Sequence, residues 1–452
     1  MIARVPRHSP KPPPSRTGFS MTTPRISLSA ASGRTTTPAI STLMQMALDQ
    51  PGLISLAAGF VDQETLPVDG TAREVAALRA EPVEGRRALQ YGATAGDVAL
   101  RSRLIDLIEA SEGAEAGSYE HLLPRTVVTT GSQQLLYLVA EALVDPGDVV
   151  IVELPTYFVF LGVLESRGAR VIGVETDEHG LRLDALDAAL AGLEAEGQLE
   201  RVKLIYTISE HSNPTGISLA EGRRAPLVAL ARKWSKKNRI FVLEDSAYRG
   251  LTYDGREPPS VWRHDPEGDT VILARTFSKT FSPGLKTGYG VLPPALVGPV
   301  LRLKGNHDFG SSNFNQVLIE RLIGDGSYDT QVRTLVGRYR SKRDVMLAAL
   351  EEHLGGIDGV SWTHPAGGLY VWLTLPEGFD AGLDGPLFPK CVGEGVLYVP
   401  GSYAFAEGSG SGAGPVPRNH ARLCYGVAGE AELVEGVRRL ARALAGCLDP
   451  VA

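Results

Sequence analysis

The sequence has few cysteines, no long apolar run and no excess of positive charge. Its 452 residues include only Cys391, Cys424 and Cys447, whose number and spacing suit neither a disulfide framework nor a metal site. No stretch approaches the roughly 20 apolar residues that a membrane-spanning helix needs. A net charge of −7 argues against a nucleic-acid partner. These absences favour a cytoplasmic protein with reduced thiols, no membrane span, no nucleic-acid partner and no bound metal.

Acidic residues are missing from the first 48 positions, and the first is Asp49. The same stretch is rich in Pro, Ser, Thr and Arg, as disordered segments and transit peptides are. We expect residues 1–38 to be a disordered extension, or one added by a start codon placed too early, with Met21 as the true start. The alternative is that this segment is a transit peptide that directs the protein to an organelle. The lack of an apolar h-region argues against secretion.

The middle of the chain alternates short β-branched runs with helical patterns, from about residue 89 to residue 310. This alternation predicts βαβ units and an α/β fold, with a mostly parallel central sheet covered by helices. Expected strands are 126–129, 149–152, 170–174, 203–207, 240–243 and 270–273, and expected helices are 133–144 and 226–237.

The pattern changes after residue 315. A long helix is expected over 339–353, then hairpin-like strands around 369–375 and 395–399, with a flexible loop at the Gly/Ser run 408–414. These features predict a smaller α+β domain. The predicted divisions are an N-terminal arm with part of the small domain at 39–85, a large domain at 86–318 and the C-terminal small domain at 319–452.

A lysine lies at the end of one predicted strand, in the stretch RTFSKTFSPGLKTGY of residues 275–289. Ser278 and Lys279 follow the strand, and a second cation, Lys286, comes seven residues after Lys279. A desolvated lysine loses its proton readily and attacks a carbonyl as a Schiff-base nucleophile. A Ser–Lys pair alone is weak evidence, because most lysines are solvated surface charges.

Two further strand ends carry residues that suit a phosphorylated ring. Gly131, Ser132 and Gln133 open a helix after a strand, where free backbone N–H groups bind a phosphate. Taken alone, a glycine there indicates only a tight turn. Tyr157 follows the next strand, either as a core aromatic or as a face on which a planar ring stacks.

Two polar residues end the next strands. Asn213, in NPTG, belongs to a plain reverse turn or donates its amide hydrogen to a phenolate-like oxygen. Asp245 ends FVLED, and Tyr248 follows three residues later. A carboxylate at the end of a buried strand is costly unless it is paired. Asp245 therefore caps a helix or faces a protonated ring nitrogen and raises that nitrogen's pKa.

Together these residues supply a phosphate site, a stacking face, a donor to a ring hydroxyl, an anchor for a ring cation and a reactive amine. Pyridoxal 5′-phosphate requires all five. They also fall at strand ends, where open parallel sheets bind ligands. The combination predicts pyridoxal 5′-phosphate as the cofactor.

With these motifs, residues of about 40–447 resemble the fold-type I, class I/II aminotransferases, nearest to the 2-aminoadipate/kynurenine and valine–pyruvate subgroup. The resemblance implies that Lys279 forms the Schiff base and moves the proton between substrate and cofactor. It implies that Asp245 holds the ring nitrogen, Asn213 and Tyr248 the ring oxygen, and that Tyr157 stacks on the ring. The implied phosphate ligands are Gly131, Ser132, Gln133, Ser278 and Lys286.

Three further segments match the same family. Tyr91, in GRRALQYGATAG, resembles the tyrosine that reaches the partner subunit's phosphate, which implies an active homodimer. Arg422, in RNHARLCYG, resembles the arginine that clamps the substrate carboxylate, a task that suits its planar fork. Gly59, in ISLAAGFVDQETLP, resembles the glycine that borders the substrate pocket, where Asn213 is also expected.

The sequence departs from the family in three places. Lys286 replaces an arginine, so bidentate phosphate binding is lost. Ala58, Phe60 and Val61 make the wall around Gly59 bulkier and drier, which favours an apolar or aromatic substrate side chain. His211 is either an acid/base neighbour of the site or a hydrogen-bonded turn residue. The run 304–316, with its polar cluster 306–308, is expected at a dimer interface near the site, where it would tune specificity.

The leading hypothesis is an enzyme that moves the amino group of an L-amino acid to a 2-oxo acid. A lyase, decarboxylase or oxidase-like enzyme on the same scaffold is the alternative. A third hypothesis is a transcription regulator with an aminotransferase-like effector domain. That architecture needs a helix-turn-helix domain ahead of the fold, and the first forty residues are too few and lack amphipathic periodicity.

Overall fold

The computed structural model describes residues 26–36, 39–50, 52–406 and 415–448. Residues 1–25 and 37–38 of the predicted extension, and the predicted loop 408–414, lie outside the described residues. Within 26–36 the chain forms a short helix, α1 (Ala30–Arg34), which no sequence pattern predicted. Arg34 donates a hydrogen bond to the carbonyl oxygen of Ser166 at 3.1 Å, which attaches this segment to the body of the protein.

An eight-stranded sheet forms the centre of the molecule. Its strands lie in the order β2 (Thr126–Thr129), β9 (Gly288–Val291), β8 (Val271–Thr276), β7 (Phe241–Asp245), β6 (Val202–Ile208), β3 (Val149–Leu154), β4 (Arg170–Asp177) and β5 (Gly180–Leu181). β9 runs antiparallel to both neighbours and β5 antiparallel to β4, while the other pairs are parallel. The predicted mostly parallel sheet is confirmed, and all six expected strands are present; β5 and β9 were not predicted.

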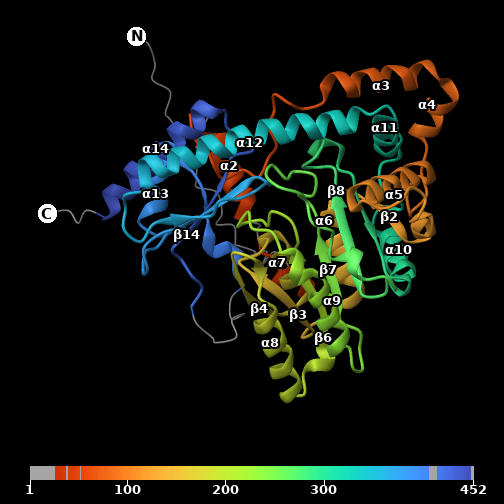
Figure 1. The fold of residues 1–452 in the computed structure, drawn as a ribbon, viewed down its shortest axis with the longest axis horizontal. Helices are drawn as coiled ribbons and strands as arrows, with labels where there is room; N and C mark the ends of the chain where they lie inside the picture. The colour runs from red at the N-terminus through yellow and green to blue at the C-terminus, as the bar shows by residue number, and fades with distance from the viewer. Residues whose placement is uncertain (1–25, 37–38, 51, 407–414, 449–452) are drawn as a thin grey trace, which may run out of the picture.

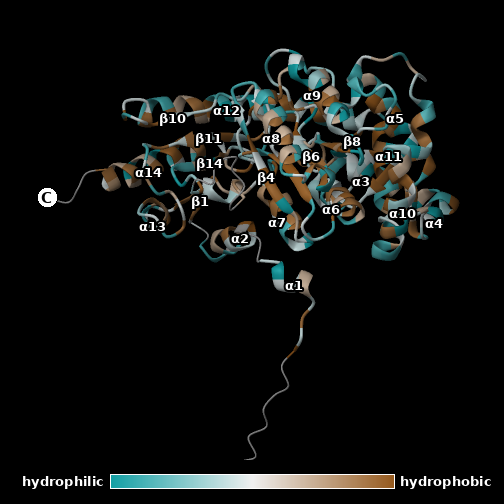
Figure 2. Ribbon diagram, turned by 90° about the horizontal axis from the view of Figure 1, so that it is seen from below, coloured by the Kyte–Doolittle hydropathy of each residue, from teal (hydrophilic) through white to brown (hydrophobic). Residues whose placement is uncertain are grey.

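Helices cover both faces of this sheet because its strands are apolar on both sides. Val150 and Val152 of β3 face one core, and Val149 and Ile151 face the other. The first core is covered by α6 (Gly131–Leu143), α7 (Phe158–Arg167) and α10 (Pro294–Asp308), and the second by α5 (Val98–Glu112), α8 (Leu183–Ala195), α9 (Glu221–Trp234) and α11 (Asn313–Gly324). Figure 2 shows the central strands as largely hydrophobic between helices of mixed colour.

A smaller group of strands lies beside the large sheet. Its four-stranded sheet has the order β10 (Ser361–Trp362), β11 (Tyr370–Thr374), β14 (His420–Cys424) and β13 (Val399–Pro400), and a separate parallel pair joins β1 (Ile54–Ser55) to β12 (Val396–Leu397). α13 (Leu387–Gly393) and α14 (Glu430–Leu448) pack here. The long helix α12 (Ser327–Leu354) runs from the neighbourhood of α11 to that of α14 (Figure 1).

The remaining elements belong to the N-terminal part and to short turns. They are the helices α2 (Ala39–Asp49), α3 (Val68–Ala80) and α4 (Pro82–Leu89), and the 3₁₀ turns η1 (Glu120–Arg125), η2 (Leu199–Arg201), η3 (Trp262–His264), η4 (Pro283–Leu285) and η5 (Gly401–Ala404). The predicted domain boundaries stay predictions. Among the described helices, none is long and apolar enough to cross a membrane.

Candidate active site

Lys279 lies three residues beyond the end of β8, and its side chain points toward the N-terminal segment. Its Nζ donates a hydrogen bond to the carbonyl oxygen of Gly59 at 2.7 Å. Desolvation lowers the pKa of Lys279 to about 8, and the charges of Arg422 and Lys286 act in the same direction. A lysine with this pKa has a substantial neutral fraction near physiological pH, which is the form that attacks a carbonyl.

Asp245 ends β7 with its carboxylate buried. One oxygen, Oδ2, accepts a hydrogen bond from the Tyr206 hydroxyl at 2.9 Å. The other, Oδ1, is buried and has no hydrogen-bond partner among the described residues. Burial raises the pKa of Asp245 to about 6, against the lowering effect of the Tyr206 bond. A buried acceptor of this kind suits a cationic N–H donor, as the predicted ring nitrogen is.

The start of α6 packs closely against the start of β9. Gly131 has a positive φ of 70°, and a Cβ on Gly288 would lie 2.5 Å from the backbone nitrogen of Ser132. Only glycine at position 288 permits this approach. The Gln133 Oε1 atom is buried without a partner in the described part of the chain. This arrangement leaves the first amides of α6 beside the segment that carries Lys286, as the predicted phosphate site requires.

The lysine-bearing turn completes this corner. The Thr276 hydroxyl donates to Ser278 Oγ at 3.0 Å and so fixes the side chain of Ser278. Lys286 is exposed and has a positive φ of 48°. It follows the turn η4, where its backbone N–H donates to the Pro283 carbonyl oxygen at 3.3 Å. The corner thus offers amides, a hydroxyl and a cation to an anion.

Arg422 joins the two parts of the site. Its Nη1 donates to Asn213 Oδ1 at 2.9 Å and its Nη2 to the Ala57 carbonyl oxygen at 2.7 Å. The guanidinium carbon lies 4.5 Å from the ring centroid of Tyr370 and 5.4 Å from that of Phe158. Within the described residues Arg422 Nε has no partner, although the side chain is buried. Flat aromatic faces hold the fork in plane, and an open N–H remains for a carboxylate.

The other predicted residues divide into two groups. Tyr157 is the residue before α7, and burial raises the pKa of its hydroxyl, with the nearby Asp245 adding to the effect. The Tyr248 hydroxyl donates to the Tyr370 hydroxyl at 3.1 Å. Tyr91, by contrast, lies on the surface with 83% of its area exposed. All predicted residues except Tyr91 therefore converge on one corner of this chain.

Of the two roles considered for His211, the structure agrees with the hydrogen-bonded turn residue. Its Nε2 lies 2.9 Å from Thr252 Oγ1, and its backbone has a positive φ of 47°. Burial lowers the pKa of His211 to about 4, so its ring is neutral at physiological pH. A Cβ on Gly367 would overlap the imidazole, and a Cβ on Gly368 would overlap the Cβ atom of His211.

The polar cluster 306–308 holds two helices together. The Gln134 amide of α6 donates to Asp308 Oδ2 at 2.8 Å, and Lys304 donates to the same carboxylate. The His307 ring stacks on Tyr137 with centroids 5.9 Å apart. These contacts account for the cluster without a ligand, and its proposed effect on specificity stays a prediction.

Sequence reasoning missed two residues of this site. Tyr370 covers Arg422 and bonds Tyr248, and Tyr206 bonds Asp245. The buried Glu153 of β3, on the other face of the sheet, accepts a hydrogen bond from Thr207 at 2.7 Å. Tyr206 could have been predicted from the sequence, because it lies in the strand that leads to Asn213 and on the same face of the sheet as Asp245. Tyr370 comes from the other sheet, and only the β11–β14 register brings it to Arg422.

Comparison with known proteins agrees with this geometry. Residues 51–440 match the family model "Aminotransferase class I and II". The chain is 33% identical to an aromatic-amino-acid aminotransferase from Thermococcus litoralis, with 87% of this chain and 88% of that protein covered. It is 32% identical to a 2-aminoadipate transaminase from Thermus thermophilus, with 92% and 96% covered.

A solved structure gives the same result. The crystal structure of the Pyrococcus horikoshii kynurenine aminotransferase superimposes with a TM-score of 0.83 at 30% identity, covering 94% of this chain and 98% of that one. The family match extends over most of the chain, from just before β1 to within α14. The chain therefore belongs to the class I and II aminotransferases and is a pyridoxal phosphate-dependent enzyme that transfers amino groups.

Proposed function

We propose that this enzyme moves the amino group of an apolar or aromatic L-amino acid to a 2-oxo acid, with Lys279 as the catalytic amine. One observation carries the proposal. Two carbonyl groups of a single segment, those of Ala57 and Gly59, accept hydrogen bonds from Arg422 and Lys279. The carboxylate clamp and the amine therefore border the same space.

Each residue has a defined task in this proposal. Lys279 would hold the cofactor until the substrate's amino group replaces the Lys279 amine, and the cofactor would then supply an electron sink that makes the substrate Cα proton acidic. Lys279 Nζ then accepts and returns that proton, and its lowered pKa suits both steps. Arg422 holds the substrate carboxylate and so orients the Cα–H bond toward Nζ. Asp245 keeps a proton on the ring nitrogen, Asn213 and Tyr248 hold the ring oxygen, and Tyr157 stacks on the ring.

The phosphate corner completes the fit. Gly131, Ser132 and Gln133 would donate backbone N–H groups, Ser278 its hydroxyl, and Lys286 a positive charge. These donors match the three acceptor oxygens of a phosphate ester. Cofactor and substrate would also engage two buried atoms that have no partner among the described residues, Asp245 Oδ1 and Arg422 Nε.

Product analysis tests the reaction type. The full enzyme, loaded with pyridoxal phosphate, is mixed with a panel of L-amino acids and one 2-oxo acid acceptor. We expect one 2-oxo acid and one new amino acid in equal amounts. Release of carbon dioxide or ammonia in place of the 2-oxo acid pair would instead support the lyase, decarboxylase or oxidase-like alternative, which no observation favours.

An apolar cavity next to the site supports the choice of substrate. It has a volume of about 180 Å³, and its lining includes Leu43 and Met44 of α2 together with Ala58 and Phe60 on either side of Gly59. No charged residue lines it. A Phe60→Asp substitution should lower kcat/KM for phenylalanine and leucine more than for a small amino acid such as alanine. Equal losses for all three would contradict the cavity's role.

We also propose that Tyr91 acts in a homodimer. Its ring is exposed and meets the exposed Phe309 ring edge to face, with centroids 5.5 Å apart, and Leu89 nearby in sequence is also exposed. An apolar surface of this kind suits a second copy of the chain. Mixing Tyr91→Ala and Lys279→Ala variants should restore activity, because one composite site per dimer keeps both residues. No recovery in a mixture shown to form hybrid dimers would contradict the role in trans.

We propose a cytoplasmic location because the cysteines are free thiols. Cys391, Cys424 and Cys447 are all free, and the first two are buried. Three unpaired thiols suit a reducing compartment. Fractionation of the source cells with an antibody to the chain tests this location.

A further inference from the structure

A layer of buried charges lies on the face of the large sheet opposite Asp245. Side chains alternate along β7, so Glu244 points into the core that contains Val242 while Asp245 points toward the other. The layer consists of Glu112, Glu210, Glu244, Arg224, Arg249 and Arg275, and we name it the rear charge layer. All of these residues are buried except Glu112, whose side chain is nonetheless inaccessible.

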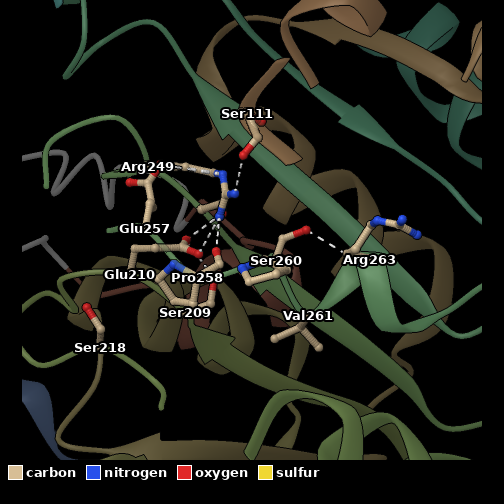
Figure 3. A network of polar contacts seen from close by, with 12 residues as sticks. Ser111, Ser209, Glu210, Ser218, Arg249, Glu257, Pro258, Ser260, Val261 and Arg263 are labelled. Carbon is tan, nitrogen blue, oxygen red and sulfur yellow. Dashed lines mark hydrogen bonds and ion pairs between the residues drawn. The ribbon is translucent and has the colours of Figure 1, made fainter. Parts of the chain in front are cut away.

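Glu210 is the centre of this layer. Its Oε1 accepts hydrogen bonds from Arg224 Nη1 at 2.8 Å and from Arg249 Nη1 at 3.0 Å. Arg249 also contacts Glu112 Oε1 at 3.1 Å, and Arg275 donates to that same atom at 2.8 Å. Figure 3 shows the Arg249 guanidinium between Ser111 on one side and Glu210 on the other.

Ser209 lies between two carboxylates and has only one proton to give. Its Oγ is 2.7 Å from Glu210 Oε2 and 2.7 Å from Glu244 Oε1. Ionised carboxylates are acceptors only, and a serine hydroxyl donates once. With both glutamates ionised, one of these two short contacts would bring together two oxygens with no hydrogen between them. One carboxyl must therefore carry a proton.

Neighbouring donors do not supply the missing hydrogen. Ser246 Oγ lies 2.6 Å from Glu210 Oε2 and donates to it, and the Val261 amide donates to Glu244 Oε1 at 2.8 Å. Neither bond places a hydrogen on the Ser209–Glu244 contact. Glu257, outside the rear charge layer but 3.7 Å from Arg249 Nε, adds a fourth carboxylate beside the three arginines, so with Glu244 ionised the anions outnumber the cations by one.

The arginines decide which glutamate is neutral. Glu210 contacts two guanidinium groups, whereas the hydrogen-bond partners of Glu244 among the described residues are the Ser209 hydroxyl and the backbone amides of Val261 and Trp262. The groups that act on Glu244 most strongly are Glu210 and Arg224. Burial raises the pKa of Glu244 and the charge of Glu210 raises it further, while Arg224 opposes the shift.

We propose that Glu244 is a protonated carboxylic acid at neutral pH, donating to Ser209, which in turn donates to the Glu210 carboxylate. This chain of hydrogen bonds ties β7 to the turn after β6. Asn213 lies in that turn and Asp245 is next to Glu244, so Glu244 acts as a positioning residue for both. The positioning role rests on the proposed function, whereas the protonation state does not.

Infrared spectroscopy tests the proton directly. The full-length enzyme is recorded well above pH 7, where Asp245 and Glu153 have lost their protons, since their pKa values are about 6 and about 7. We expect the carbonyl band of one protonated carboxyl group, shifted by ¹³C-glutamate labelling. The band should vanish in Glu244→Gln and persist in Glu153→Gln, the matched buried control. Absence of the band from Glu153→Gln at pH 7, where Glu153 no longer contributes, overturns the proposal.

A second measurement tests the positioning role. In Glu244→Gln the amide N–H₂ replaces the acid O–H toward Ser209, although the Val261 amide loses its acceptor. We expect kcat/KM within about threefold of wild type for Glu244→Gln and about tenfold lower for Glu244→Ala. Wild-type kcat/KM in Glu244→Ala overturns the positioning role, and so does an equal loss in both variants. If Glu244→Ala fails to fold, Ser209→Ala breaks the same chain of hydrogen bonds and takes its place, with wild-type kcat/KM again overturning the positioning role.

The pH profile separates a neutral Glu244 from an ionised one. A carboxyl whose pKa is raised by folding stabilises the protein at low pH, and this stability is lost as pH rises through its folded pKa. Wild type should therefore lose stability relative to Glu244→Gln on going to alkaline pH. A constant difference between the two across that range overturns the proposal, independently of any activity assay.

Discussion

The carboxylates on the two faces of the large sheet differ at the ends of β6 and β7. On the face of the rear charge layer, the rear face, both oxygens of Glu210 and both oxygens of Glu244 accept or share hydrogen bonds, and the buried atoms of the layer without partners among the described residues are the arginine atoms Arg249 Nε and Arg275 Nε. On the opposite face, the site face, the carboxylate atom Asp245 Oδ1 is buried without a partner among the described residues, and so is Arg422 Nε of the neighbouring sheet. Glu244 and Asp245 are adjacent in sequence, so this contrast arises within one peptide unit.

The contrast indicates that one face of the sheet is rigid and the opposite face is able to bind ligands. A buried polar atom without a partner costs roughly 1–3 kcal/mol, a cost that a ligand removes when it binds. The rear charge layer has no such openings at its carboxylates and holds the strand ends in place. Substitutions on the site face should therefore act mainly on turnover, and those on the rear face mainly on stability.

Lys279→Ala gives the largest expected effect. Removing the amine should lower transamination by about 10⁴-fold or more, because the residue both holds the cofactor and moves the proton. Thermal unfolding of the cofactor-free enzyme should stay near wild type, since Lys279 is desolvated and donates to Gly59. Lys233→Ala is the control, an exposed lysine of α9 paired with Asp187. Turnover of Lys279→Ala at the control's rate would contradict the assignment.

Glu210→Gln should have the largest effect on stability. It leaves Arg224 and Arg249 buried against a neutral amide, and removal of one partner from a buried ion pair costs about 3–5 kcal/mol. Urea unfolding of the cofactor-free enzyme measures the change. Asp184→Asn, which breaks the fully exposed pair with Arg182, should cost much less stability, because water and salt screen that pair. Equal losses in the two variants would remove the distinction between the faces.

Arg422→Lys should act on substrate binding and leave the fold intact. The charge remains, but the two-pronged donor that contacts Asn213 and Ala57 is lost. We expect kcat/KM for the amino acid to fall by about 10²-fold, in line with the loss of a buried hydrogen-bonded charge pair. Steady-state kinetics measures this, with Arg438→Lys on the surface of α14 as the control. An unchanged KM for the amino acid would place the carboxylate elsewhere.

Asp245→Asn should raise stability while lowering activity. The folded pKa of Asp245 is about 6, above its ordinary value of 3.8, so its contribution is present below about pH 4 and is lost as pH rises through about 6. The asparagine variant does not ionise, and near pH 7 it should exceed wild type by about 2–3 kcal/mol in the cofactor-free state. Urea unfolding from acid to neutral pH measures the difference. A gap that shrinks with rising pH would contradict the sign.

The strand ends were predictable because apolar runs stop there at polar or turn residues. Asp245, Asn213 and Lys279 each follow such a run, and the structure has strands ending beside all three. Helix starts were harder. α12 begins at Ser327, twelve residues before the predicted start, because the polar stretch with Gly337 weakens the helical pattern. In α9 Pro226 suggested a first turn but lies inside a helix that begins at Glu221.

The rear charge layer could not be predicted from sequence. Glu112 of α5, Glu210 after β6 and Arg275 of β8 meet only because three elements stack against one sheet face. Each of these residues, seen alone, is typical of a solvated surface. The same holds for Tyr370, which reaches Arg422 across two strands of the smaller sheet. Local patterns predicted the residues that end strands, and long-range packing selected the partners of those residues.

Lys286→Arg should have the smallest effect of these substitutions. It tests the phosphate corner of the site face. Position 286 has a positive φ of 48°, a strain that lysine and arginine share, so the backbone cost cancels between them. Both side chains are cations, so the lowering of the Lys279 pKa by charge at 286 is kept. The arginine adds a fork beside the amides of Gly131 and Ser132, and the affinity for pyridoxal phosphate should rise by about three- to tenfold. Titration of the cofactor-free enzyme with pyridoxal phosphate measures it, with inorganic phosphate as a competitor. Unchanged binding would mean that residue 286 directs its side chain away from the phosphate, and weaker binding would mean that the space beside the phosphate does not admit the larger fork.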